Sequence, residues 1–485
     1  MPVSDMNFKK LISTTAFGMF VLFVLNLVLK AWHISGQQIA MDEPFTISAS
    51  QRELSDIIHY LGGFNNPPLY ELLLHFIVVK TGPVLPWVRM ISLFASALTP
   101  AFVFYLGSRY WNKSIAWTGS LLFTFATYQV YFSHEARVYA LFELLSCCSA
   151  ILFLGLISGE NTGWKKLRMS CFILVNTLLI YAHYFGFVML FTEFVFLLFL
   201  WRRLERRKFY GLALHYLLYP LLYIPQSIVM FTRFKNASAT HWVPPPSVED
   251  LYINLLKFLN APVIAFSVIV LLVVAGVFAL LKKKGGICVQ AGFLLTWFLL
   301  PYLLMFAVSF KMPVFLERYL IFLSVPIYIL IPISIAFLIK NEKLSMSVQL
   351  IFLTAFIFTC NLNPSHHRNW EGIANYVRQH KDAETAIVLT PSWDEQPFTY
   401  YYKLDYFRDY DHSIALLKNE HIYALDGLNE QDSVLLMQYP RILFINGGEK
   451  FADKKLGVSK FLERNYSATA APGLPVPNMS LYLKR

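Results

Sequence analysis

Long apolar runs recur through almost all of the first 362 residues, and they constrain the fold more than any other feature. A helix needs about 20 apolar residues to cross roughly 30 Å of hydrocarbon at about 1.5 Å per residue. Hydrophobic residues make up 56% of the 485 residues and charged residues only 15%, whereas soluble domains carry roughly 25% charged residues. The chain is therefore predicted to be an α-helical multi-pass membrane protein.

Eleven segments are predicted to be membrane spans. The stretch PPLYELLLHFIVVKTG is left out because it begins with two prolines and carries three ionisable side chains, so an interfacial or re-entrant helix is expected there. The first span has no small-residue cleavage site before MDEP and is predicted to stay uncleaved. The spans lie near 11–31, 86–108, 115–132, 138–158, 169–183, 186–201, 209–231, 259–281, 288–310, 318–339 and 346–362.

The basic clusters in the loops predict the orientation. With eleven spans these clusters all fall on one side, which the positive-inside rule assigns to the cytoplasm. The N-terminus is then cytoplasmic and the C-terminus external. Most of the net charge of +11 is explained in this way, so it does not indicate a nucleic-acid partner. The clusters are Lys9 with Lys10, Arg109 with Lys113, WKKLR, RRLERRK, KKKGG and KNEK.

The composition changes at about residue 363. The segment NWEGIANYVRQH has helical spacing, whereas TAIVLT and RILFING are typical of short buried strands. Residues 1–362 are therefore predicted to form the transmembrane domain, and residues 363–485 a small external α/β domain. All five cysteines lie in or beside the spans, so the sequence predicts neither a disulfide framework nor a CxxC metal site.

Polar groups that the positive-inside rule does not explain collect in loops on the external side. Charged side chains at membrane depth cost a few kcal/mol each and persist where they pair or line a cavity. A shared site on this face is therefore predicted, although loops are polar in any membrane protein. The segments are Asp42 with Glu43, FNNPPLY, SHEARVYA, AHYFG, ATHWVPPPS and FLERYL.

Two arginines suggest what this site binds. Arg137 and Arg318 each lie at the external mouth of a span beside aromatic residues. Arginine suits bidentate binding of phosphate, and a lipid phosphate is the natural ligand near the headgroups. The alternative is that both side chains snorkel and anchor helix ends. A groove with external carboxylates and these arginines fits an enzyme that takes a group from a polyprenyl phosphate.

The order of the motifs resembles that of GT-C glycosyltransferases. An Asp-Glu pair after the first span is followed by NNPPLY, YFSHEARVYAL and a late ERYL, as in the branch of the protein O-mannosyltransferases and the lipid A aminoarabinose transferase. The resemblance implies that Asp42 is the catalytic base or orients the acceptor, and that Arg137 holds the donor phosphate. It also implies the inner membrane of a bacterium, with the C-terminal domain in the periplasm. Asn66 departs from the pattern, because many relatives have His before Pro-Pro.

The expected reaction transfers a monosaccharide from a polyprenyl-phosphate donor to a lipid, glycan or protein acceptor. The leaving phosphate is stabilised by Arg137 with Arg318, and Asp42 takes the proton of an acceptor hydroxyl. A single displacement predicts inversion at the anomeric carbon. If the acceptor is itself a phosphate, Asp42 orients it instead. Glu43 is expected to support Asp42, in an extended turn favoured by Pro44.

The remaining candidates have weaker signals. Glu143 and Glu193 lie inside spans and are expected to be paired or cavity-facing, with no assigned role. The acids and histidines could bind a divalent cation, but no spacing is diagnostic and metal dependence is left open. Helix capping or interfacial anchoring would explain several residues equally well. The residues predicted to line the substrate groove are Asn66, Tyr70, His134, Glu135, Tyr139, His183, Tyr184, His241, Trp242 and Glu317.

Two other classes of protein remain open at this point. An oligosaccharide ligase or polymerase that uses a polyprenyl-diphosphate donor would need similar groups. A transporter would place its charges near the membrane midplane and usually shows inverted repeats. This chain concentrates the charges at one face and has no visible repeat, which favours the transferase.

Overall fold

The computed structural model describes residues 5–39, 42–62, 67–158, 165–236, 245–281, 288–312, 314–364, 369–448, 457–469 and 473–485. The chain divides into two compact units. The first consists of Met1–Ile34, Leu54–Ile77 and Leu85–Pro364, and the second of Ser35–Glu53, Val78–Val84 and Ser365–Arg485. The predicted division at 362/363 did not include the two early segments of the second unit.

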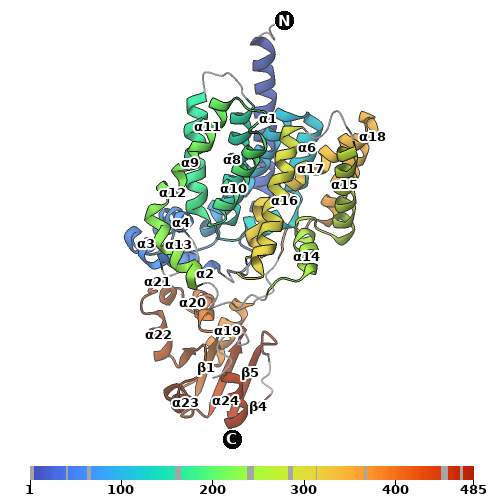
Figure 1. Ribbon diagram of the computed structural model, residues 1–485. Coiled ribbons are helices and arrows are strands. Elements are labelled where there is room, and N and C mark those ends of the chain that lie inside the picture. The colour runs from blue at the N-terminus through green and yellow to red at the C-terminus, as the bar shows by residue number, and fades with distance from the viewer. Residues whose placement is uncertain are drawn as a thin grey trace. The chain divides into compact units, whose positions relative to one another are not determined.

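The first unit is helical (Figure 1). Its helices begin and end close to the predicted spans, because a long apolar run is a strong local signal. They are α1 (Asp5–Ala31), α3 (Leu54–Gly62), α4 (Leu69–Thr81), η1 (Trp87–Arg89), α5 (Met90–Tyr110), α6 (Lys113–Thr124), α7 (Thr127–Ser133), α8 (Tyr139–Ile157), α9 (Lys165–Ala182), α10 (Gly186–Phe199), α11 (Arg206–His215), α12 (Leu218–Leu222), α13 (Ile224–Asn236), α14 (Val248–Phe258), α15 (Pro262–Leu281), α16 (Val289–Ser309), η2 (Glu317–Leu323), α17 (Ser324–Leu338) and α18 (Glu342–Thr359).

Within the described ranges, six helical stretches are long and apolar enough to cross a membrane. The pair Arg206–Leu222 and Ile224–Thr232, bent by 70°, would add a seventh, and Thr15–Ala31 and Gly186–Phe199 are shorter apolar helices. The count of eleven spans therefore stays a prediction. The six stretches are Trp87–Tyr110, Tyr139–Ile157, Pro262–Leu281, Val289–Ser309, Glu317–Leu338 and Glu342–Thr359.

Two segments predicted as continuous spans are broken. The predicted span 209–231 consists of α11, α12 and α13, and the predicted span 115–132 consists of α6 and α7. The second break is stabilised by Asn260. Its amide donates to the carbonyl of Phe125 at 2.8 Å and accepts from the backbone N–H of Thr127 at 2.8 Å. The backbone groups freed by the break thus have partners, as buried polar groups require.

The packing of the first unit is closest around α5, which contacts α1, α6 and α8. A side chain at Gly107 would place its Cβ 2.7 Å from the Cα of Ala116, so a glycine is needed where α5 meets α6. Helix α17 is mostly buried, whereas α15 and α18 expose most of their apolar side chains. In a membrane protein such exposed apolar faces contact lipid.

The second unit contains α2 (Glu43–Ser50) and a mixed five-stranded sheet of order β2-β1-β3-β5-β4. Strand β1 is parallel to β2 and β3, and β5 is antiparallel to β3 and β4. The strands are β1 (Thr385–Thr390), β2 (Ile422–Ala424), β3 (Arg441–Asn446), β4 (Tyr466–Thr469) and β5 (Met479–Lys484). The other helices are α19 (Trp370–His380), η3 (Ser392–Asp394), α20 (Glu395–Tyr402), α21 (Leu404–Arg408), α22 (Ser413–Asn419), α23 (Glu430–Leu436) and α24 (Val458–Asn465).

Both faces of this sheet are covered, which explains why TAIVLT is apolar throughout. Ile387 and Leu389 point into a core that includes Trp370 of α19. Ala386 and Val388 lie in a second core with residues of α23 and α24. Side chains alternate between the faces of a strand, so a strand buried on both faces is a continuous apolar run. Helix α19 and strands β1 and β3 lie in the three segments predicted for them.

Candidate active site

The segment 135–137, the EAR motif, forms a tight bend in the first unit between α7 and α8. The backbone N–H of Arg137 donates to the carbonyl of Glu135 at 2.7 Å. Ser92, on α5, donates its hydroxyl to the carbonyl of Arg137 at 3.0 Å. The Nε2–H of His134 donates to the carbonyl of Lys30 at 2.6 Å. Helices α1 and α5 therefore fix the bend at both ends.

Arg137 is buried, with only 6% of its surface exposed. Its guanidinium carbon lies 5.7 Å from the ring centroid of Tyr139, the first residue of α8. Tyr70 is fully buried behind the bend, where its hydroxyl lies 2.8 Å from the hydroxyl of Ser92. Ser92 of α5 thus holds the Arg137 backbone, and Tyr70 of α4 in turn contacts Ser92.

His183 is the centre of an aromatic cluster. Its ring stacks on Phe142 and on Phe185, each at 5.0 Å between centroids. The ring centroid of Tyr319 lies 5.5 Å from that of His183, and the ring centroid of Tyr139 lies 6.2 Å from it. The backbone N–H of Phe185 donates to Nδ1 of His183 at 3.2 Å, so the proton of the neutral ring is on Nε2.

Two arginines from different elements lie beside this cluster. Arg318 lies on η2, with its guanidinium carbon 5.5 Å from the ring centroid of Tyr319. Arg137 and Arg318 are both close enough to His183 for their charges to act on its ring. The structure thus brings Arg137 and Tyr139 together with His183 and Arg318, which lie far from them in the sequence. Two cations beside one aromatic cluster can bind an anion.

A buried polar network joins α7, α8 and α17. The side-chain amide of Gln129 donates to Glu143 at 2.9 Å and to Ser324 at 2.8 Å. Ser324 also donates to the same carboxylate oxygen of Glu143. Glu143 is therefore paired, as expected for an acid inside a span. Glu193 is likewise bonded, accepting from Ser149 at 2.6 Å.

Lys30 extends this network toward α1. Its ammonium donates to the carbonyl and the hydroxyl of Ser96 at 2.9 and 2.8 Å. It is also close enough to Glu143 for the two opposite charges to attract. Since His134 is bonded to the backbone of Lys30, this network and the EAR bend share one support.

Two predicted groove residues have other contacts. The carboxylate of Glu317 forms an ion pair with Lys257 at 3.1 Å. Tyr184 packs against a cluster that includes Tyr219 and Tyr223. Asn66, His241 and Trp242 lie outside the described residues. The groove roles of all these residues stay predictions.

The acid pair belongs to the second unit, where it begins α2. Asp42 is the N-cap, with φ −88° and ψ −4°, and its carbonyl accepts from the N–H of Thr46 at 3.3 Å. Glu43 is fully buried, whereas Asp42 is partly exposed. The prediction of an extended turn is therefore wrong. Pro44 lies in the first turn of the helix, where its missing N–H costs no hydrogen bond.

Residues on both sides of the acid pair tie its segment to the rest of the second unit. Before it, Gln38 donates to Asn369 at 3.1 Å, and the N–H of Ile39 donates to the hydroxyl of Tyr401. After it, Gln51 donates to the carbonyl of Phe407 at 3.2 Å. Arg52 forms an ion pair with Asp411 at 3.1 Å. The position of Asp42 thus depends on α19, α20 and the residues around α21.

No group of three or more His, Cys, Asp or Glu side chains that could hold a metal ion occurs in the described part of the chain. Sequence reasoning also missed several supporting residues, namely Ser92, Gln129, Asn260 and Ser324. The only local signal was a polar residue in or beside an apolar run, which often marks buried pairing.

No family model matches the chain, and no curated protein matches its sequence. Solved structures do match it. The structure of ArnT from Cupriavidus metallidurans bound to undecaprenyl phosphate aligns with a TM-score of 0.57 at 11% identity, over 96% of this chain and 98% of ArnT. The chain has the GT-C fold.

Two archaeal structures show the same GT-C fold. The oligosaccharyltransferase of Archaeoglobus fulgidus in complex with Zn and sulfate has a TM-score of 0.56 at 9% identity, over 96% of this chain and 73% of that enzyme. AglB from the same organism, in complex with an inhibitory peptide and a dolichol-phosphate, has a TM-score of 0.56 at 9% identity. The alignment covers 97% of this chain and 74% of AglB. At such low identity the likeness establishes the GT-C fold alone.

Proposed function

We propose that this protein is an integral membrane glycosyltransferase. It moves a monosaccharide from a polyprenyl-phosphate donor of the undecaprenyl type to an acceptor on the extracytoplasmic face. The observation that carries the proposal is the pair Arg137 and Arg318 beside the His183 cluster. The GT-C fold supports it, and ArnT, with that fold, was solved with undecaprenyl phosphate.

The arginines act on the leaving group. Glycosyl transfer passes through an oxocarbenium-like transition state, and a sugar phosphate releases its phosphate as an anion. Arg137 and Arg318 stabilise this charge, and burial of Arg137 strengthens its interaction with it. Because the leaving group is already a stable anion, no general acid is required. The Nε2–H of His183 is a further donor available to the same anion.

Asp42 acts on the acceptor. It takes the proton of an acceptor hydroxyl as general base, or orients the acceptor when that group is a phosphate. Its partial exposure suits contact with a substrate, whereas the buried Glu43 suits support of α2. A direct displacement of the phosphate by the acceptor inverts the anomeric carbon.

Transfer of a whole oligosaccharide is the second candidate, because the archaeal oligosaccharyltransferase has the same fold at a similar TM-score. The lengths favour a monosaccharide donor. This chain aligns with 98% of ArnT but with only 73–74% of the archaeal enzymes. A donor panel of undecaprenyl-phosphate monosaccharides and diphosphate-linked oligosaccharides separates the two candidates.

The test is transfer of radiolabelled sugar by the purified protein in proteoliposomes. Loss of a general base typically slows a reaction by about 10²–10⁴-fold, so Asp42→Asn should fall in this range with both substrates saturating. Arg137→Ala should lose on the order of 1.5–3 kcal/mol or more of donor and transition-state binding. Arg109→Ala is the matched control, because Arg109 lies in the last turn of α5, away from the EAR bend.

Near-normal turnover of folded Asp42→Asn would remove its catalytic role, and a larger loss in Glu43→Gln would transfer that role to Glu43. Unchanged donor affinity and turnover in Arg137→Ala would remove the phosphate assignment. Transfer from diphosphate-linked oligosaccharides alone would favour the second candidate.

A further inference from the structure

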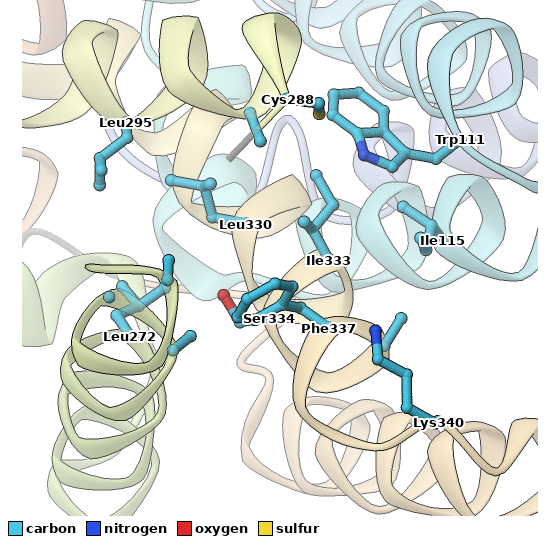
Figure 2. A pocket seen from close by; sticks show the side chains of 15 residues that line it. Trp111, Ile115, Leu272, Cys288, Leu295, Leu330, Ile333, Ser334, Phe337 and Lys340 are labelled. Carbon is cyan, nitrogen blue, oxygen red and sulfur yellow. The ribbon is translucent and has the colours of Figure 1, made fainter. Parts of the chain in front are cut away.

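The first unit contains an apolar cavity of about 380 Å³ that no part of the proposed reaction uses. Its walls come from α6, α15, α16 and α17 and include Leu272, Leu295 and Leu330 (Figure 2). The volume lies within the range of roughly 300–1,000 Å³ found for small-molecule sites. Its lining includes neither Arg137 nor Arg318, and none of the aromatic residues around His183.

The occupant must come from the membrane. Helix α15 forms one wall, and the rest of its surface is largely exposed and apolar, with Val263 and Phe266 among the most exposed side chains. A helix of this kind faces lipid. A cavity beside it is therefore open to the hydrocarbon chains of the bilayer. Contact between such a chain and an apolar wall costs no desolvation of polar groups.

Two polar groups are placed along the cavity. Lys340 lies at its edge just beyond the end of α17, and its ammonium lies 5.3 Å from the ring centroid of Phe337. Ser334 lies deeper and is only 6% exposed. Its hydroxyl points toward the space between Leu330 and Leu272 in Figure 2 and has no hydrogen-bond partner within the described ranges. This hydroxyl is not among the fully buried unpaired atoms, so it can donate to a ligand in the cavity.

The spacing of these groups indicates the class of lipid. Lys340 follows Ser334 by six positions, of which the first four complete α17, a rise of roughly 6 Å toward Lys340. A cation at the end of a membrane helix attracts an anionic headgroup, and basic pockets between such helices bind lipid headgroups. A hydroxyl below it needs an acceptor, which the ester carbonyl of a diacyl lipid supplies. The isoprenoid chain of a polyprenyl phosphate has no such acceptor.

We propose that this cavity binds an anionic diacyl phospholipid. One acyl chain lies against Leu272, Leu295 and Leu330, the ester carbonyl accepts from Ser334, and the phosphate lies at Lys340. This site is independent of the proposed transferase activity. On the predicted topology it belongs to the cytoplasmic leaflet, because Lys340 begins the basic KNEK loop.

The test measures lipid binding directly. Purified protein in detergent is titrated with palmitoyl-oleoyl phosphatidylglycerol, with the matching phosphatidylcholine and with undecaprenyl phosphate, and bound lipid is counted by native mass spectrometry. Phosphatidylglycerol should bind about fivefold more tightly than phosphatidylcholine, the effect expected of one lysine near a headgroup. Lys340→Gln should abolish this preference. Ser334→Ala should weaken both diacyl lipids several-fold.

Gly276→Leu gives the sharpest variant, because Gly276 lines the cavity and a Cβ there meets no atom within 4 Å. The Cβ of the leucine has room there and the side chain takes up part of the cavity, so phosphatidylglycerol binding should be lost. Gly211→Leu is the matched control, since a Cβ at Gly211 also meets nothing within 4 Å and lies outside the cavity.

Three results would overturn the proposal. The first is equal binding of phosphatidylglycerol and phosphatidylcholine by the unmodified protein. The second is phosphatidylglycerol binding that survives in Gly276→Leu. The third is loss of undecaprenyl phosphate alone in Gly276→Leu, which would assign the cavity to a polyprenyl chain.

Discussion

Two hydroxyl groups in series support the backbone of Arg137. Ser92 donates to the Arg137 carbonyl, so the hydroxyl of Tyr70 is left to donate to Ser92. All three groups are buried, and a buried acceptor that loses its donor costs about 1–3 kcal/mol. Under the proposed function the side chain of Arg137 binds the donor phosphate, and this binding requires the backbone to stay in place.

Ser92→Ala should therefore destabilise the protein by about 1–3 kcal/mol and lower its affinity for the donor. Thermal unfolding in detergent and the donor KM measure the two effects. Ser146→Ala is the matched control, because Ser146 is equally buried and its one hydrogen bond to a described residue goes to the carbonyl of Phe142 in its own helix. If both variants raise the donor KM equally, Ser92 has no special role in positioning Arg137.

Glu420 makes one part of the second unit sensitive to acid. Burial opposes its ionisation, but hydrogen bonds outweigh burial and hold the pKa of Glu420 well below its ordinary value. A carboxylate with a lowered pKa stabilises the folded state above the unfolded pKa of about 4.3, and this contribution is lost as the pH falls toward the folded-state pKa. The donors are Lys381, Tyr402, Lys403 and Tyr406.

Glu420→Gln should accordingly lower the midpoint of thermal unfolding at pH 7, and the difference from the unmodified protein should shrink below about pH 4. Glu384→Gln is the control, because Glu384 is 71% exposed and, among the described residues, forms an ion pair only with Arg441 at the surface, where an ion pair contributes about 0–1 kcal/mol. A Glu420→Gln difference that is constant from pH 7 to pH 3 would contradict this account.

Some of these residues could be predicted from the sequence and others could not. Arg137 and Asp42 were predicted because each belongs to a local motif after an apolar run. Ser92 gave no such signal, since serine is common in membrane helices and its partner lies 45 positions away. The helical conformation of Glu43 was also missed, because the extended bias that Pro44 imposes on the residue before it did not prevent α2 from beginning there.

Among the elements, the Ser35–Glu53 segment contains the acid pair and contacts the C-terminal part of the second unit. Arg52 pairs with Asp411, and its guanidinium carbon also lies 3.9 Å from the ring centroid of Tyr410. The C-terminal residues therefore have a role that the sequence did not suggest, which is to position α2.

Arg52→Gln should loosen α2 and raise the hydrogen-exchange rate of its backbone amides several-fold. Exchange measured by mass spectrometry on the purified protein tests this directly. Arg408→Gln is the matched control, because Arg408 forms a local ion pair with Asp405, three residues before it, at 3.3 Å. Exchange in α2 that is equal in Arg52→Gln and the unmodified protein would show that the ion pair does not hold the segment.

The helices show what the length of an apolar run can predict and what it cannot. Apolar length predicted the helices well, because about 20 such residues are needed to cross the membrane. The break between α6 and α7 was missed, because its partner Asn260 lies 135 positions from Phe125. No residue within 115–132 is a proline, so nothing local indicated the break.

For the whole molecule, the GT-C fold was predicted from the order of four motifs, and the comparison with solved structures confirms it. The orientation rests on different grounds, namely the one-sided distribution of basic loops. Moving each Lys or Arg cluster across the membrane would be costly, so the predicted orientation should hold along the chain. It places Cys288, beside the KKKGG loop, in the cytoplasm and Pro440 outside.

Labelling with a membrane-impermeant maleimide tests this orientation in intact bacterial cells that express the protein. Cys288 is exposed, yet it should react only after the cells are permeabilised. A Pro440→Cys variant in a Cys288→Ser background should react in intact spheroplasts, because Pro440 is exposed and its only described backbone bond, from Lys484, does not need its side chain. Labelling of Cys288 in intact spheroplasts with protection of position 440 would reverse the topology, and Asp42 and Arg137 would then face the cytoplasm.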